Sequence, residues 1–160
     1  MTKIELGAVP EQTGARYPSP YDEPCKARRF RRLGDAAGLT RLGATRLVLP
    51  PGAWSSQRHW HTADDEFVVI LEGEVVLVTD AGEEVLRAGD CCAFKAGEPN
   101  GHCAQNRSSR DAVLLTVSSK VPGDGAEYPD VDLRALPGGQ GGRGAYVHKD
   151  GTPYQHPKGP

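Results

Sequence analysis

The sequence lacks any run of about 18 apolar residues, the length that a helix needs to cross a membrane. Its first twelve residues, MTKIELGAVPEQ, contain no apolar segment of the kind found in secretory signals. Stretches rich in Ala, Glu, Lys and Leu are also scarce, which argues against a bundle of long helices. We therefore expect a cytoplasmic protein with no membrane partner and little helix.

Cysteine and net charge are both low. The four cysteines, Cys25, Cys91, Cys92 and Cys103, show no CxxC spacing. Neighbouring strand residues such as Cys91 and Cys92 point to opposite faces and make a poor disulfide, so we expect reduced thiols. The net charge is −2 and the pI is about 6.2. This balance excludes a generally basic protein that coats nucleic acid.

Glycine and proline are abundant, with 20 and 13 residues in a chain of 160. The length suits one domain with one modest core, and the Gly and Pro content favours short strands joined by turns. Composition divides the chain into three zones. We predict an N-terminal arm over 1–40, a strand-rich core over 41–118, and a C-terminal extension over 119–160 that packs on the core and has disordered last residues.

The strand-rich zone predicts an antiparallel sandwich or barrel, because short apolar runs alternate regularly with turn signals. One basic segment, KARRFRR (26–32), precedes this zone. Alternation places Arg28, Phe30 and Arg32 on one face of a strand, and we interpret the segment as a charged edge strand. The predicted strands of the central zone cover 46–50, 57–61, 66–72, 75–79, 84–87, 91–94, 102–106 and 112–117.

Three histidines of the central zone suggest a metal site. His59 and His61 are two residues apart, so on a strand both side chains face the same way. Glu66 opens the next apolar strand and His102 opens a later one. Nitrogen and oxygen ligands of this kind suit a divalent transition metal such as Zn, Fe(II), Mn or Ni. Asp64 and Asp65 are alternative carboxylate ligands.

Two motifs in this zone resemble those of the cupin superfamily. The first, G-x5-H-x-H-x(3,4)-E-x6-G, is matched from His59 to Gly73, with its first glycine, Gly52, one residue further upstream than the pattern requires. The second, G-x5-P-x-G-x2-H-x3-N, departs by having Lys95 in place of proline and two extra residues before the histidine. Its matching residues are Gly89, Gly97, His102 and Asn106.

The resemblance implies an all-β fold, the double-stranded β-helix or jelly-roll barrel of cupins, with N- and C-terminal extensions. It also implies one metal ion per chain, held by His59, His61, Glu66 and His102. Short bacterial cupins of this kind are often described as sugar-phosphate isomerases, but fold alone does not fix function.

We expect a metal-dependent enzyme that acts on a small polar metabolite by isomerase, lyase or dioxygenase chemistry. The alternative is a non-catalytic cupin that binds or senses a sugar-like molecule. Catalytic residues and the roles of Cys91, Cys92 and Lys95 stay open.

Both faces of the segment 66–72 are apolar, which indicates association between chains. If Glu66 faces the interior, then Val68 and Ile70 do too, and Phe67, Val69 and Leu71 point outward. A strand half-exposed to water normally alternates apolar and polar residues. We therefore predict a homodimer that covers these outer side chains.

Overall fold

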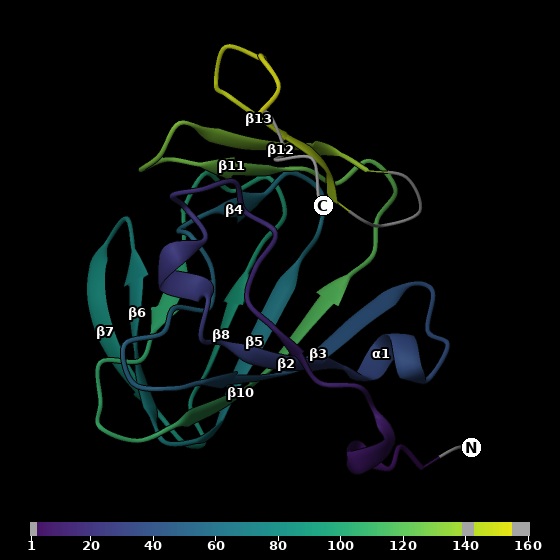
Figure 1. Cartoon of the computed structure of the whole chain (residues 1–160), viewed down its shortest axis with the longest axis vertical. Coiled ribbons are helices and arrows are strands. Elements are labelled where there is room, and N and C mark those ends of the chain that lie inside the picture. The colour runs from purple at the N-terminus through teal and green to yellow at the C-terminus, as the bar shows by residue number, and fades with distance from the viewer. Residues whose placement is uncertain (1–2, 139–142, 155–160) are drawn as a thin grey trace.

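The computed structural model describes residues 3–138 and 143–154, which form short strands and very little helix (Figure 1). The prediction of disorder for the last residues falls largely on 155–160, outside the described residues. In chain order the elements are η1 (Leu6–Ala8), β1 (Gln12–Thr13), η2 (Glu23–Cys25), β2 (Arg29–Arg32), α1 (Leu33–Ala36), β3 (Leu42–Leu49), β4 (Trp60–His61), β5 (Glu66–Glu72), β6 (Glu74–Thr79), β7 (Gly82–Arg87), β8 (Cys91–Phe94), β9 (Cys103–Gln105), β10 (Ala112–Ser119), β11 (Ala126–Tyr128), β12 (Leu133–Pro137) and β13 (Arg143–Val147).

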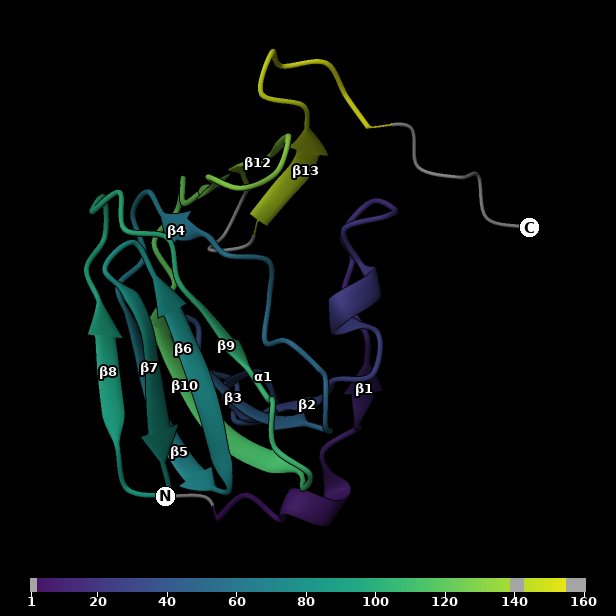
Figure 2. The same ribbon diagram turned by 90° about the vertical axis from the view of Figure 1, so that its left-hand side faces the viewer.

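The strands form three antiparallel sheets. The largest has the order β1-β2-β3-β10-β5-β8, and a smaller sheet has the order β7-β6-β9. These two sheets lie one in front of the other in Figure 2. The third sheet, β13-β12-β11-β4, lies across one end of the pair at the top of Figure 1. This is the all-β jelly-roll arrangement that the motifs predicted.

The main core lies between the two facing sheets, because every second residue of their strands points inward. From the large sheet come Leu47, Val68, Ile70 and Leu114, and from the small sheet come residues of β6, β7 and β9. Burial of Val68 and Ile70 confirms that the Glu66 face of β5 is the inner face. Phe67 and Leu71, on the other face of β5, are more than two-fifths exposed.

A second core ties the N-terminal arm to the C-terminal strands. Tyr17 and Cys25 of the arm are buried against Tyr128 and Leu133. The ring of Tyr17 meets that of Tyr128 edge-on, with centroids 5.7 Å apart. Strand β11 also pairs with β4, where Ala126 lies opposite His61. The sequence-based division into arm, core and extension stays a prediction, but both ends of the chain contribute to packing beside β4.

Most of the predicted strands are present, with two informative differences. The segments 66–72 and 91–94 form β5 and β8 with the predicted bounds. The segment 57–61 is a strand only at Trp60 and His61, because His59 makes just an isolated bridge to His102. The basic segment forms β2 as predicted, but β1 pairs with Arg29 and Phe30, so only the remainder of β2 is an edge.

Within the described ranges, no helix is long and apolar enough to cross a membrane. None of the four cysteines forms a disulfide, and Cys91 is the most exposed of them.

Candidate metal centre

His59 and His102 lie side by side because their backbones pair. The N–H of each donates to the carbonyl of the other, over 3.1 and 2.9 Å. Their ring centroids are 5.0 Å apart, and the ring of His61 lies 5.1 Å from that of His59. All three histidines are buried. The two-residue spacing of His59 and His61 therefore places both rings on one side of the chain, as the sequence predicted.

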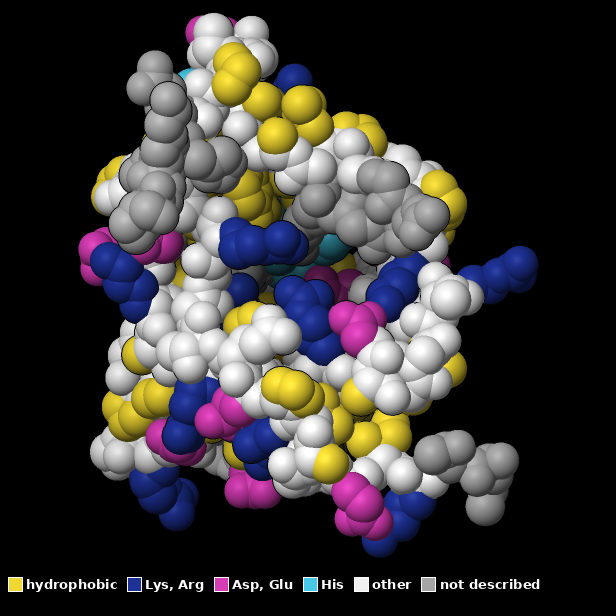
Figure 3. All heavy atoms as spheres, turned by 45° about the vertical axis from the view of Figure 1, so that its right-hand side comes forward, with side chains coloured by type: hydrophobic (Ala, Val, Ile, Leu, Met, Phe, Trp, Pro, Cys, Tyr) yellow, Lys and Arg dark blue, Asp and Glu magenta, His cyan; other side chains and the backbone are white. Residues whose placement is uncertain are grey.

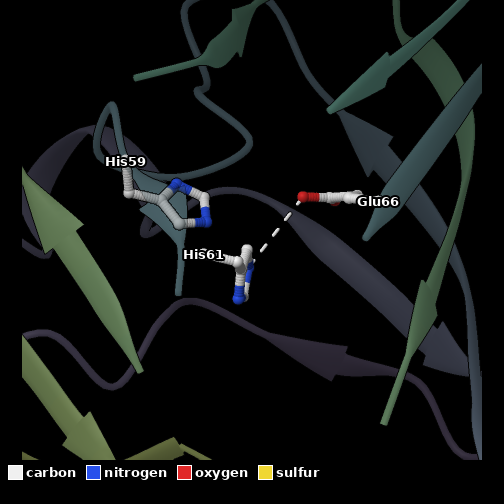
Figure 4. Close-up of side chains that lie close together, drawn as sticks. All are labelled: His59, His61 and Glu66. Atoms are coloured by element: carbon white, nitrogen blue, oxygen red, sulfur yellow. Dashed lines mark ion pairs between the residues drawn. The ribbon is translucent and has the colours of Figure 1, made fainter. Parts of the chain in front are cut away.

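Glu66 brings a carboxylate to the same place from the start of β5. Its Oε2 lies 3.1 Å from Nε2 of His102 and 4.0 Å from Nε2 of His61. His59, His61 and Glu66 offer ligand atoms that all lie within 4.8 Å of one another (Figure 4). His102 falls outside this group of mutual distances but contacts Glu66 directly. The fold thus assembles the four side chains that the motifs singled out, while their role as ligands stays a prediction.

The partners of the two neighbouring histidines select the tautomer that a metal requires. Nδ1 of His59 lies 2.9 Å from the carbonyl oxygen of Gln57. A carbonyl only accepts, so Nδ1 carries the proton and the lone pair is on Nε2. Nδ1 of His61 likewise lies 2.6 Å from Oδ2 of Asp124. Hydrogen bonds from the far ring nitrogen to a carbonyl and a carboxylate are typical of metal-ligating histidines. The residues present therefore fit a metal ion.

Asp124 is the main site residue that the sequence analysis missed. Burial raises the pKa of its carboxyl, but hydrogen bonds from His61 and from the backbone N–H groups of Ala63 and Asp64 outweigh that effect and lower it overall. Asp124 is thus held as a carboxylate beneath His61. Its sequence context, VPGDGAEY, carries no metal signal, and only the packing of this loop under β4 shows its role.

The alternative carboxylates predicted from the sequence have different surroundings. Asp64 is buried and forms a second close group with His61 and Asp124. Its carboxylate accepts the N–H of Val121 over 2.7 Å, and burial raises its pKa. Asp65 is exposed and accepts the N–H of Ala96, as expected of a polar turn. Neither lies as close to His102 as Glu66 does, within the contacts that the structure describes.

His102 is held by stacking rather than by a hydrogen bond at its far nitrogen. Its ring lies 3.5 Å from that of Phe94, centroid to centroid, with 6° between the planes. Within the described residues, its buried Nδ1 has no hydrogen-bond partner. Phe94, at the end of β8, therefore fixes the plane of the ring and directs Nε2 towards Glu66.

The candidate centre lies at the wall of an interior cavity of about 200 Å³. Its lining is mixed: aliphatic side chains of both sheets lie beside His59, Glu66 and His102, and arginine, serine and threonine side chains also contribute to it. A second, outer cavity of about 780 Å³ reaches His61 and Asp124 from the side of the arm. The two cavities adjoin, because several residues line both of them, among them Arg28, Phe30, Arg32 and Glu66.

Cys91 and Cys92 divide between the two faces of β8, as strand alternation predicts. Cys92 lines the interior cavity, whereas Cys91 is exposed. Cys103 is buried and its thiol lies 2.9 Å from the carbonyl oxygen of Ser56. Burial raises the pKa of the Cys92 thiol to about 11 and that of Cys103 to about 12. Lys95 is exposed and lines a small recess together with His61 and His102.

Comparison with known proteins agrees with this geometry. The family model described as "Cupin domain" matches residues 45–118. A crystal structure from Silicibacter pomeroyi, described as a sugar phosphate isomerase from a cupin superfamily, is 40% identical and superposes with a TM-score of 0.89. That match covers 96% of this chain and 97% of the other, so the similarity extends to the arm and the C-terminal strands.

Two further matches are more distant. A solved structure from Acidithiobacillus ferrooxidans is 24% identical, with a TM-score of 0.70 and 82% of each chain covered, and shows the shared fold. An oxalate-binding protein of Thermotoga maritima is 35% identical over 72 residues, which span 45% of this chain and 57% of that protein. The family model, the near full-length relative and the assembled motif residues lead to one assignment. The chain belongs to the cupin superfamily.

Proposed function

We propose that this protein is a metal-dependent cupin enzyme that acts on a small polar metabolite by isomerase- or lyase-type chemistry. One divalent transition metal per chain, Zn, Fe(II), Mn or Ni, would be held by His59, His61, Glu66 and His102. The observation that carries the proposal is the convergence of three buried histidines and the half-buried Glu66. Of the four, His59, Glu66 and His102 line the interior cavity. The relative described as a sugar phosphate isomerase, at 40% identity, supports the reaction type.

When bound, the metal would supply a Lewis acid that polarises a substrate oxygen. The chain's own residues prepare the site for it. Asp124 and the Gln57 carbonyl hold the protons on Nδ1 of His61 and His59, which keeps both Nε2 atoms basic. All three histidines are buried, and charges interact more strongly where burial limits contact with water.

The test is metal analysis of protein purified without added metal. We expect about one equivalent per chain in the wild type and a severe loss in the double variant His59→Ala, His61→Ala. His148→Ala is the matched control, because His148 also contacts a carboxylate, that of Asp132, but lies outside the site. Full metal occupancy in the double variant would contradict the site assignment.

A non-catalytic binding or sensing protein is the alternative, and two observations favour it. The Thermotoga maritima relative is described as an oxalate-binding protein. Among the described residues, Glu66 is also the only carboxylate that lines the interior cavity, so no additional acidic group is available there as a general base. Metal-restored protein should be screened against sugar phosphates, hydroxy acids and oxalate for both binding and turnover. Binding without turnover would support the alternative.

A measurement of oxygen consumption distinguishes isomerase or lyase activity from dioxygenase activity. If Fe(II) is the metal, a dioxygenase would consume oxygen with its substrate, whereas an isomerase or lyase would not. The same screen, run in an oxygen electrode with Fe(II)-loaded protein, distinguishes them.

We further propose that the protein is a homodimer. The outer side of β5 presents Phe67 and Leu71, each more than two-fifths exposed. On the neighbouring strand β10, Val117 lies opposite Phe67 and Leu115 lies opposite Val69, which extends the apolar surface across two strands. A second copy of this chain that packs on this surface would remove it from water.

A further inference from the structure

The arm brings positive charge to the cavity through alternate residues of β2. Phe30 lies opposite Leu47 of β3 and Arg32 lies opposite Thr45. Leu47 belongs to the main core, so this side of β2 faces the interior. Arg28, just before the strand, lines the same cavities as Phe30 and Arg32. All three residues lie outside residues 45–118, the part that matches the family model.

The Phe30 ring positions the two guanidinium groups. The central carbon of the Arg28 guanidinium lies 5.6 Å from the ring centroid and that of Arg32 lies 5.3 Å from it. The two carbons are therefore at most about 11 Å apart, which follows from these two distances. Cation–π contacts of this kind hold Arg side chains over the ring and leave their N–H groups available as donors.

Neither arginine forms an ion pair with a carboxylate of the described part of the chain. Arg28 donates to the backbone carbonyls of Gly14 and Ser55, which are neutral. Within the described residues, the side chain of Arg32 has no hydrogen-bond or ion-pair partner.

The carboxylates of the outer cavity, by contrast, have protein partners. Asp35 pairs with Lys120, Asp124 with His61, and Asp64 accepts backbone and hydroxyl hydrogens. Figure 3 shows dark-blue side chains around a hollow in which histidine cyan and acidic magenta are visible.

The sheet register sets the distance between the arginines and the candidate metal centre. Arg32, Thr45, Thr116 and Val68 form one row across four adjacent strands, and Glu66 lies two residues from Val68 on β5. Three strand spacings amount to about 14 Å, part of which the long Arg side chain spans. A ligand that contacts both ends must therefore carry its anionic group several bonds from the group at the centre.

We propose that Arg28 and Arg32 form an oxyanion subsite for the phosphate or carboxylate at the far end of the substrate. Guanidinium groups bind both oxyanions through paired hydrogen bonds. This inference rests on the proposed function in one respect, that the other end of the substrate binds at the metal centre. The subsite makes the N-terminal arm a determinant of specificity, and it selects anionic metabolites over neutral ones of the same size.

The test measures binding of three matched probes by calorimetry: glycerol 3-phosphate, glycerate and glycerol. Wild-type protein should bind one or both anions and not glycerol. Arg32→Gln should weaken anion binding about tenfold or more, the usual effect of losing a hydrogen bond to a charged group. The matched control is Arg46→Gln, which removes the same charge from β3, next to Arg31 on the opposite side of the sheet. It should change affinity less than twofold.

Preference for the phosphate or for the carboxylate probe identifies which oxyanion the subsite takes. Equal binding of glycerol, or equal losses in Arg32→Gln and Arg46→Gln, would overturn the proposal. Arg32 is exposed and its side chain makes no hydrogen bond in the described chain, so its substitution should leave the fold intact. Arg28→Lys keeps the positive charge but loses the planar guanidinium group. It should therefore reduce the affinity for the anionic probes less than Arg32→Gln does.

All measurements are made on metal-free and on metal-loaded protein. One outcome is that the histidine variants lose metal and still bind the anions in a manner that depends on Arg32. That result would support both proposals and show that the subsite binds anions independently of the metal. Arg32-dependent binding in a protein that never takes up metal would refute only the proposed function. Normal metal binding without an Arg32 effect would refute only the subsite.

Discussion

At the scale of single residues, Asp124 illustrates how a buried carboxylate can prepare a histidine for metal binding. It accepts the Nδ1 proton of His61 and two backbone N–H groups, so its charge is satisfied where water is scarce. The same contact fixes which ring nitrogen carries the lone pair. The metal affinity of the centre should therefore depend on Asp124, although Asp124 is not among the four proposed ligands.

Asp124→Asn should weaken metal affinity about 10–100-fold, the usual cost of losing a partner that orients a ligand. The amide retains the shape of the carboxylate but loses its charge. Metal affinity is measured by competition with a chelator. Asp132→Asn is the control, because Asp132 makes the same contact with Nδ1 of His148 at 2.7 Å. Equal affinity in Asp124→Asn and the wild type would remove Asp124 from the centre.

The four thiols should differ in reactivity. Burial raises the pKa of Cys25 and of Cys92 to about 11 and that of Cys103 to about 12, so the reactive thiolate is scarce at all three. Cys91 is exposed. Alkylation of the folded protein at pH 8, followed by peptide mass spectrometry, should label Cys91 first. Denatured protein should label all four alike, and early labelling of Cys25 or Cys103 in the folded state would contradict the burial described above.

At the scale of elements, the turn between β5 and β6 depends on one glycine. Gly73 has a φ of +73°, which disfavours side chains, and a Cβ there would lie 2.7 Å from the carbonyl oxygen of Asp111. The turn is therefore tight because the loop before β10 packs directly against it. Because β5 starts at Glu66, any shift of this turn along the strand would also move the candidate centre.

Gly73→Ala should lower the free energy of unfolding by about 1–3 kcal/mol, from backbone strain and from the close contact. Urea denaturation followed by tryptophan fluorescence measures the change. Gly7→Ala is the control, since a Cβ at Gly7 meets nothing within 4 Å, and it should shift stability by no more than about 0.5 kcal/mol. Equal stability of the two variants would show that the turn tolerates a side chain.

At the scale of the whole molecule, both ends of the chain build the surroundings of a centre whose proposed ligands come from the middle. The N-terminal arm supplies Tyr17, Arg28 and Arg32 to the cavities. The loop before β11 supplies Asp124, and β11 pairs with the strand that carries His61. A chain trimmed to residues 45–118 would retain the four proposed ligands but lose these supports.

The proposed homodimer gives a prediction at the same scale. Light scattering at micromolar concentration should give about twice the chain mass of 17.1 kDa. Phe67→Glu should shift the protein towards monomer, because it places a charge in the covered surface. Val85→Glu on β7 is the control, since Val85 is 44% exposed and Phe67 is 43% exposed but the two lie on different sheets. A wild-type monomer at every concentration would show that the outer side of β5 is simply solvated.

The sequence alone determined the fold class, most of the central strands and the four candidate ligands. Local rules gave part of this, because period-two alternation sorts Phe67 from Val68 and two-residue spacing aligns His59 with His61. The jelly-roll fold and the full set of four ligands came from the resemblance to the cupin motifs. The C-terminal strands β11–β13 were missed because they are only three to five residues long and lie in a zone rich in Gly and Pro. Strand β11 also pairs with β4, which is far away in the chain. Asp124 and the cavity-lining residues Arg28 and Arg32 were not singled out because their places beside the centre depend on contacts between distant segments.

Only the tertiary structure decided what surrounds the four candidate ligands. No local pattern tells that Asp124 lies under His61, 63 residues earlier in the chain. Nor does a local pattern show that Arg28 and Arg32 line the cavity beside Phe30. Hydrogen bonds and cation–π contacts between distant segments depend on how whole sheets pack. Local sequence patterns predict where strands occur, but they do not predict which strands pair or pack against each other.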